Sequence, residues 1–138
     1  MSDHEIQEIR KMVHEKKCCS SIIVQMGLSL KGERNDQMVR EVSALCKGLQ
    51  CGLLCGTLTG GVMMLHLFSS NQTEATEMIK ELVEWFESIY GEKYGGINCI
   101  DITNLDQQKI TDICPSLIEK TYSQAKSILV DYGKLEDS

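Results

Sequence analysis

The sequence predicts an all-α protein that forms one domain over residues 1–138, a bundle of five or six helices around a buried, glycine-containing central helix. Three observations indicate this class. Apolar residues recur at helical spacing through most of the chain, and no long segment alternates strictly between polar and apolar residues. A single stretch near the middle carries no charge at all. A chain of 138 residues is also long enough to bury one core.

The first third of the chain predicts two helices. Ser2 and Glu5 have the spacing of a capping box, and the apolar positions that follow indicate a helix from about residue 3 to 16. The adjacent cysteines at 18–19 mark the expected start of a second, short helix. Gly27 is expected to end it, because glycine is common just after the last turn of a helix.

The middle of the chain predicts a third helix and then the central one. Asp36 is expected to cap a segment whose apolar face continues to Leu49. Cys46 lies on that face, so we interpret it as a buried, unreactive thiol. The uncharged stretch at 48–68 is then predicted to be a glycine-rich turn that leads into a buried helix from about Gly56 to its end.

The second half predicts two more helices. The clearest amphipathic helix begins at Asn71 or Thr73 and ends at Gly91. The region after it lacks a sustained period, so Cys99 is expected in a loop or a short turn. Pro115 is the only proline, and it is expected at the first position of the final helix, where its missing N–H does no harm.

Charge and composition limit the function classes. A net charge of -6 argues against nucleic-acid binding, which requires a basic surface to neutralise phosphates. The first ten residues are too charged for a secretory signal, so a cytoplasmic location is expected. Gly52, Gly56 and Gly60 have the spacing of close-packed membrane helices, but polar residues dilute the uncharged stretch and a membrane span is disfavoured.

Seven cysteines are a high count for a chain of this length. In a reducing compartment, metal binding, redox chemistry or core packing explains them better than a disulfide scaffold. Cys55 and Cys114 each precede a predicted helix, where the positive end of the helix dipole favours a thiolate. The alternative, that cysteine is only a tolerated small residue at these two positions, stays open at this point.

Four segments resemble one family. They are Cys18-Cys-Ser-Ser-Ile22, Cys55-Gly-Thr-Leu-Thr-Gly60, Phe86-Glu-Ser-Ile-Tyr-Gly91 running on to Asn98-Cys99, and Cys114-Pro-Ser-Leu-Ile118. Together they resemble the small redox-active proteins named for their spaced cysteines, the C_GCAxxG_C_C family, over about residues 10–130. That family is similar in length and carries a Cys-Gly-Ala-x-x-Gly motif, and here Thr57 stands in place of the alanine.

The resemblance implies redox activity and four functional cysteines, namely Cys18, Cys55, Cys99 and Cys114. Cys19 competes with Cys18 for the first position, and the spacing to the following isoleucine favours Cys18. Cys46 and Cys51 are additional to the family pattern, and their roles are not predicted.

Two chemistries follow from four such cysteines. One is thiol–disulfide exchange in which Cys55 attacks, typical of a thiol-dependent oxidoreductase whose partner is a redox protein or a small thiol. The other is coordination of zinc or an iron–sulfur cluster by Cys18, Cys55, Cys99 and Cys114. Gly56 and Gly60 are the candidate cofactor-binding residues, since they let other segments approach Cys55. A helical interaction protein with inert cysteines is the third alternative, because no Cys-x-x-Cys motif is present.

Overall fold

The computed structural model describes residues 1–136, and these form an all-α bundle, as predicted. The long helices are α1 (Asp3–His14), α2 (Cys19–Lys31), α4 (Gly56–Phe68), α5 (Gln72–Phe86) and α8 (Gln107–Asp131). The shorter ones are α3 (Asp36–Glu41), α6 (Glu92–Tyr94) and α7 (Cys99–Thr103). Single turns η1 (Val42–Leu45), η2 (Gly48–Gly52) and η3 (Glu87–Gly91) connect them.

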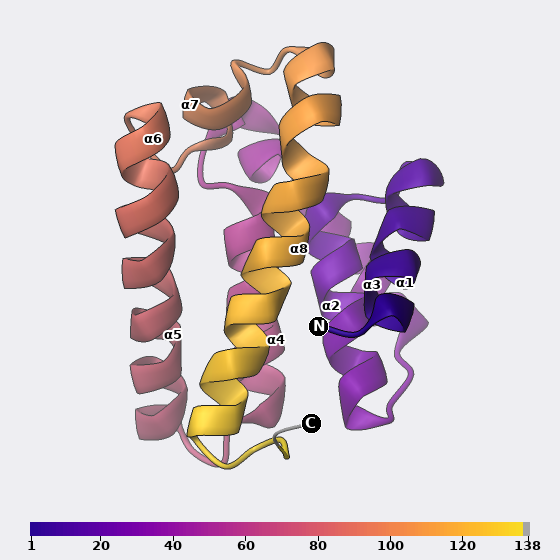
Figure 1. Ribbon diagram of the computed structural model, residues 1–138, viewed down its shortest axis with the longest axis vertical. Helices are drawn as coiled ribbons and strands as arrows, with labels where there is room; N and C mark the ends of the chain where they lie inside the picture. Colours follow the sequence, from indigo (N-terminus) through magenta and orange to yellow (C-terminus); the bar gives the residue numbers. More distant parts are fainter. Residues whose placement is uncertain (137–138) are drawn as a thin grey trace.

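The uncharged helix α4 lies at the centre of the bundle. It packs against α2, α5 and α8, and Figure 1 shows it behind α8, between the other two. Leu58, Met64 and Leu65 on this helix are each at most 1% exposed. The predicted bounds and the buried, central position of this helix are therefore confirmed.

Glycines bring the backbones of α2 and α4 into contact. A Cβ atom on Gly60 would lie 2.9 Å from the carbonyl oxygen and 3.0 Å from the Cα of Ser20. On Gly56, a Cβ atom would lie 2.9 Å from the sulfur of Cys19. Two residues one turn apart on α4 thus face the first two residues of α2, and no side chain fits between the helices here.

The second helix is longer than predicted. It continues past Gly27 to Lys31, and Gly32, with a φ of 72°, ends it. Gly27 is buried against α4. A Cβ atom on this residue would lie only 2.8 Å from Cγ of Met64. This glycine therefore serves helix packing, and the sequence signal for a helix end was misleading.

The third helix is shorter than predicted. Asn35, rather than Asp36, provides the cap by accepting a hydrogen bond from the Met38 amide. α3 ends at Glu41, and the chain passes through η1 into a run of residues with positive φ. The apolar face expected to continue to Leu49 is consequently not one helix face.

The last three helices also differ from the expected bounds. Gly91 has a helical φ of -61°, so the helix begun by α5 continues through η3 and α6 until Gly95, whose φ is 77°. Cys99 begins the short helix α7. The final helix starts at Gln107, capped by Asp106, so Pro115 lies in its interior and not at its first position.

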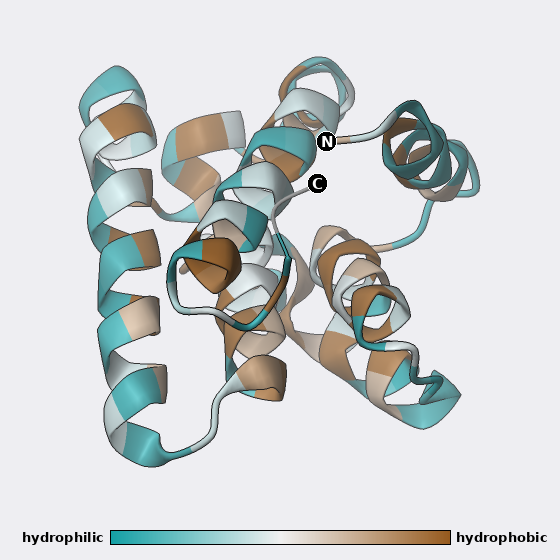
Figure 2. Cartoon of the chain, turned by 60° about the horizontal axis from the view of Figure 1, so that its bottom comes forward, coloured by the Kyte–Doolittle hydropathy of each residue, from teal (hydrophilic) through white to brown (hydrophobic). Residues whose placement is uncertain are grey.

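Helix α5, at the left of Figure 2, is amphipathic, with polar residues outward and apolar ones toward the bundle. Ala75, Met78, Leu82 and Phe86 on its inner face are fully buried. Within residues 1–136, no helix is long and apolar enough to cross a membrane.

A partly buried polar contact joins α1 to α8. Tyr122 donates a hydrogen bond to the Glu5 carboxylate, and the Lys126 ammonium lies 3.0 Å from the same group. Burial raises the pKa of Glu5, but the hydrogen bonds from Tyr122, the Ser2 amide and Lys126 outweigh it and lower the pKa to about 2. The carboxylate therefore favours the folded state only while it is ionised.

Glu5→Gln should reduce the stability of the fold and make that stability less dependent on pH in the acidic range. Since the pKa of Glu5 is lowered on folding, this residue stabilises the native state above about pH 4.5, and that contribution is lost as the pH falls toward about 2. We expect a loss of about 1–2 kcal/mol at pH 7 and a shallower decline of stability between those pH values. Urea unfolding at a series of pH values measures both. An unchanged acid limb would contradict this role.

Gly60→Ala should destabilise the fold by about 1–3 kcal/mol, because the new methyl group meets backbone atoms of Ser20 that cannot rotate away. Gly91→Ala is the matched control, with a helical φ and no neighbour closer than 3.5 Å to the added carbon. It should be neutral or stabilise by up to about 1 kcal/mol. Equal effects of the two variants in urea unfolding would disprove the close α2–α4 contact.

Candidate functional site

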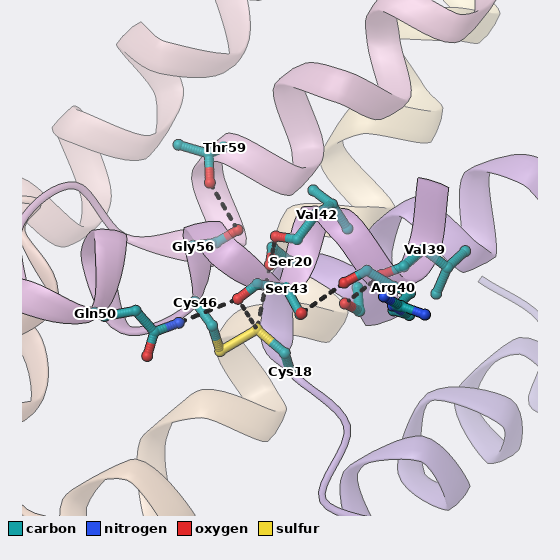
Figure 3. The surroundings of a disulfide bond; sticks show 11 residues. Cys18, Ser20, Val39, Arg40, Val42, Ser43, Cys46, Gln50, Gly56 and Thr59 are labelled. Atoms are coloured by element: carbon teal, nitrogen blue, oxygen red, sulfur yellow. Dashed lines mark hydrogen bonds between the residues drawn. A yellow bond between two sulfur atoms is a disulfide. The ribbon is translucent and has the colours of Figure 1, made fainter. Parts of the chain in front are cut away.

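Two cysteines from different segments form a disulfide. Cys18 directly precedes α2 and Cys46 directly follows η1, and their Cα atoms are 5.9 Å apart (Figure 3). The expectation that Cys46 is an unreactive thiol on a helix face is therefore wrong. The helix that would have held it ends earlier, and the extended backbone at Cys46, with a ψ of 149°, turns the side chain toward Cys18.

Buried serines hold the two disulfide segments together. Ser20 donates a hydrogen bond of 3.0 Å to the Val42 carbonyl, and Ser21 donates one of 2.8 Å to the Val39 carbonyl. The Ser20 hydroxyl oxygen also lies 3.2 Å from the Cys18 sulfur. The first turn of α2 is thereby fixed to the segment that carries Cys46, so the disulfide does not by itself bring these elements together.

Cys19 supplies a third sulfur at the same place. The sulfur atoms of Cys18, Cys19 and Cys46 all lie within 4.8 Å of one another. Cys19 also lies directly against Gly56, at the start of the central helix. Of the two adjacent cysteines, Cys18 is thus paired with Cys46, while Cys19 faces the segment that carries Cys55.

A left-handed turn follows the disulfide. Lys47, Gly48, Leu49 and Gln50 all have φ between 54° and 62°. This conformation costs about 1–2 kcal/mol for each residue other than glycine. Gly48 is required here because a Cβ atom on it would lie 2.1 Å from the Leu53 carbonyl oxygen. The turn carries backbone strain beside the sulfur atoms, a combination found at functional sites.

Cys55 and Cys99 are brought together by an isolated antiparallel bridge between Leu54 and Asn98. The Cys55 amide donates to the Ile97 carbonyl at 3.1 Å, and the Cys99 amide donates to the Leu53 carbonyl at 2.6 Å. The bridge thus holds Cys55, just before α4, and Cys99, the first residue of α7, on adjoining segments. Both cysteines are buried, 6% and 8% exposed respectively.

Cys114 reaches the same region from the interior of α8. Burial raises its pKa to about 12, and the neighbouring sulfur atoms of Cys19, Cys55 and Cys99 add to the rise. We call Cys19, Cys55, Cys99 and Cys114 the inner thiols. Cys51, by contrast, is exposed on η2.

Burial raises the pKa of Cys19, Cys55 and Cys114 and keeps these thiols protonated, contrary to the expectation that Cys55 and Cys114 are acidified at helix starts. It raises the pKa of Cys55 to about 11, although the amides of Thr57 and Leu58 at the start of α4 lie near the sulfur and act in the opposite direction. Burial likewise raises the pKa of Cys19. For Cys114 the expected dipole is absent, because this residue lies inside a helix and not at its start.

Two buried hydroxyl groups next to the thiols have no hydrogen-bond partner among the described residues. Thr57 is 1% exposed and lies beside Cys19, and Tyr90 is 6% exposed and lies near Cys55. Unpaired buried polar atoms are costly, and a third such group among the described residues is the Thr121 hydroxyl, on α8 beside Gly61. The sequence offered one signal for Thr57, which replaces an alanine in the family motif, and none for Tyr90.

A metal would find three ligands at the disulfide end of the site. Within residues 1–136, Cys18, Cys19 and Cys46 are the only three candidate ligands from His, Cys, Asp and Glu whose ligand atoms lie within 4.8 Å of one another. Sulfur atoms about 3.8 Å apart surround a tetrahedral zinc ion, so this spacing fits thiolate coordination after reduction. The disulfide form offers no such set, because two of the sulfurs are bonded to each other.

The rate of alkylation should differ between exposed and buried free cysteines. Because the pKa values of Cys55 and Cys114 are raised, these thiols stay protonated near pH 8 and become thiolates only as the pH approaches about 11 and about 12. We expect iodoacetamide to modify exposed Cys51 first and these two at least tenfold more slowly, as followed by peptide mass spectrometry. Urea-unfolded protein is the control, and equal native rates would contradict the burial of the inner thiols.

Comparison with known proteins agrees with the cysteine pattern. A family model described as "Putative redox-active protein (C_GCAxxG_C_C)" matches residues 17–128, which span all seven cysteines. Searches of curated proteins and of solved structures find no match. Since the matched region covers most of the chain, the protein belongs to the C_GCAxxG_C_C family.

Proposed function

We propose that the protein is a thiol–disulfide redox protein that cycles Cys18 and Cys46 between a disulfide and two thiols, with Cys19 as the exchanging thiol. One observation carries the proposal, namely that the three sulfur atoms lie within 4.8 Å of one another. Thiol–disulfide exchange requires an attacking sulfur beside the disulfide, and Cys19 is in that position.

The exchange step moves a bond and no net electrons. The Cys19 thiolate attacks the Cys46 sulfur, the Cys18–Cys46 bond breaks, and a Cys19–Cys46 disulfide forms. Cys18 leaves as a thiolate and takes up the proton that Cys19 lost. The Ser20 hydroxyl lies 3.2 Å from the Cys18 sulfur, and it can donate a hydrogen bond to that leaving thiolate by rotating away from the Val42 carbonyl.

A second exchange would carry the disulfide inward. The Cys55 thiolate attacks Cys19 of the Cys19–Cys46 disulfide, Cys46 leaves as a thiolate, and the oxidised pair becomes Cys19–Cys55. Cys99 and Cys114 remain reduced beside this pair, as reserve thiols. In this scheme Cys18 and Cys55 take the redox role that the family resemblance implies, Cys99 and Cys114 take no part in the exchange, and Cys19 links the outer pair to Cys55.

The raised pKa values of Cys19, Cys55 and Cys114 suit thiols that stay reduced and do not react with every oxidant in solution. A protonated, buried thiol resists oxidants in solution, and it attacks a neighbouring disulfide only through the small fraction of molecules in which it is deprotonated. The unpaired hydroxyl of Thr57 lies where it can donate to a thiolate at Cys19. The protein would thus act as a thiol-dependent oxidoreductase or electron carrier toward an external thiol partner.

Metal binding by the reduced protein is the second candidate. The observation that favours it is the same spacing of three sulfurs, which fits a thiophilic divalent ion such as zinc. The ligands would be Cys18, Cys19 and Cys46, so oxidation to the disulfide would release the ion. Zinc content of the protein purified anaerobically distinguishes this use from exchange without metal.

Removing Cys18 tests the exchange. In Cys18→Ser under mild oxidation, we expect a Cys19–Cys46 disulfide to form in most molecules, because the two sulfurs are already neighbours. Mass spectrometry of alkylated peptides identifies the pair, and thiol counting should give five free thiols in the oxidised wild-type protein and seven after reduction.

Cys51→Ser is the matched control, since it removes a thiol that lies outside the site and should leave the Cys18–Cys46 pair intact. If Cys46 stays free in Cys18→Ser while the wild-type disulfide forms, the exchange through Cys19 is disproved. If the oxidised wild-type protein has seven free thiols, the proposed redox cycle fails.

A further inference from the structure

A surface cavity of about 560 Å³ opens beside the disulfide. It lies between the end of α1, the start of α2 and the α3–η1 segment, and Cys18 forms part of its wall. Its volume is within the range of small-molecule sites, roughly 300–1,000 Å³, and is too small for a folded partner to enter. A small molecule in this cavity would therefore lie against Cys18, one of the two disulfide residues.

Cations outnumber anions around this cavity. Lys16, Lys17 and Arg40 line it, and Asp36 is the one carboxylate among the described lining residues. Asp36 is paired with Arg34 at 2.9 Å and Arg40 with Glu41 at 3.1 Å, whereas neither lysine forms an ion pair with any described residue. The whole chain has a net charge of -6, so this local excess of positive charge opposes the overall balance.

The backbone fixes the two lysines at the rim. Lys16 has a φ of 62°, and its amide donates to the Val13 carbonyl at 3.0 Å. The Lys17 amide donates to the Met12 carbonyl, also at 3.0 Å. The end of α1 is thus closed by two hydrogen bonds, and Lys17 is next to Cys18 in the chain.

We propose that this cavity binds a small, negatively charged thiol, which reduces the Cys18–Cys46 disulfide. The inference rests on the proposed function and adds the class of the reductant. Lys16 and Lys17 attract the anion, and the cavity presents it to the Cys18 sulfur. Charge near the disulfide also raises the local thiolate concentration, because the positive field favours the ionised thiol.

The reaction balances in two steps. The thiolate of the small molecule attacks the Cys18 sulfur, a mixed disulfide forms, and Cys46 leaves as a thiolate that takes up a proton. A second molecule of the thiol then attacks the sulfur that the first molecule contributed to the mixed disulfide, and Cys18 is released. In total two small thiols become one disulfide, and the two electrons they give reduce Cys18 and Cys46.

The test compares three two-carbon thiols that differ in charge, namely 2-mercaptoethanesulfonate, 2-mercaptoethanol and 2-aminoethanethiol. Rates of reduction of the oxidised full-length protein are measured at equal thiolate concentration and low salt. We expect the anionic thiol to react roughly threefold to tenfold faster than the neutral one, the cationic one to be slowest, and the differences to shrink in high salt.

The double variant Lys16→Gln/Lys17→Gln should lose the preference for the anionic thiol and keep its rate with 2-mercaptoethanol. Lys80→Gln/Lys93→Gln removes the same charge from the α5–α6 side of the molecule, away from α1 in Figure 1, and should keep the preference. Equal rates for the three thiols, or a preference that survives in Lys16→Gln/Lys17→Gln, would overturn the inference.

The two hypotheses fail in different ways. If the Cys18–Cys46 disulfide forms and the three thiols reduce it at equal rates whatever their charge, the anionic-thiol site is wrong. The proposed redox cycle is not affected by that result. A disulfide that only a protein reductant can open likewise overturns the anionic-thiol site alone. If no Cys18–Cys46 disulfide forms in the oxidised protein, both hypotheses are wrong.

Discussion

The contact between the first turns of α2 and α4 is the constraint on which the rest of the site depends. Gly56 lies against the Cys19 sulfur and Gly60 against the Ser20 backbone, so the two helices meet without intervening side chains. That approach places Cys19 between Cys46 on one side and Cys55 on the other. Gly56 and Gly60 therefore have two roles. They allow the two helices to pack closely, and they allow cysteines from distant segments to lie near one another.

Burial decides the protonation state of the thiols of Cys19, Cys55 and Cys114. A helix N-terminus stabilises an anion by about 0.3–1 kcal/mol at the surface, whereas a buried charge costs several kcal/mol unless it is paired. Cys55 experiences both effects, and its pKa rises to about 11. The thiols therefore stay neutral until a disulfide, a metal ion or another group enters the site. The unpaired hydroxyls of Thr57 and Tyr90 are consistent with a site that becomes complete only then.

The disulfide is partly exposed, whereas two of the inner thiols lie in the core. Cys18 borders a surface cavity with an excess of cations, while Cys55 and Cys99 are buried beside the Leu54–Asn98 bridge. Cys19 lies within 4.8 Å of the Cys18 and Cys46 sulfurs and also contacts Gly56, the residue that follows Cys55. In the proposed exchange, Cys19 would link an external thiol to a buried one.

The sequence by itself determined the helical class, the capping of α1 and both ends of the central helix, because hydrophobic period and cap residues act locally. It also indicated the family and which cysteines to expect in a functional role. Only the tertiary structure decided that Cys46 bonds to Cys18, that Gly27 packs instead of ending a helix, and that Pro115 lies within α8. These outcomes depend on contacts between segments far apart in the chain, and on the left-handed turn at Lys47–Gln50, whose strain no local propensity predicts. A cysteine's neighbours and its burial, which set its reactivity, are likewise properties of the packed bundle.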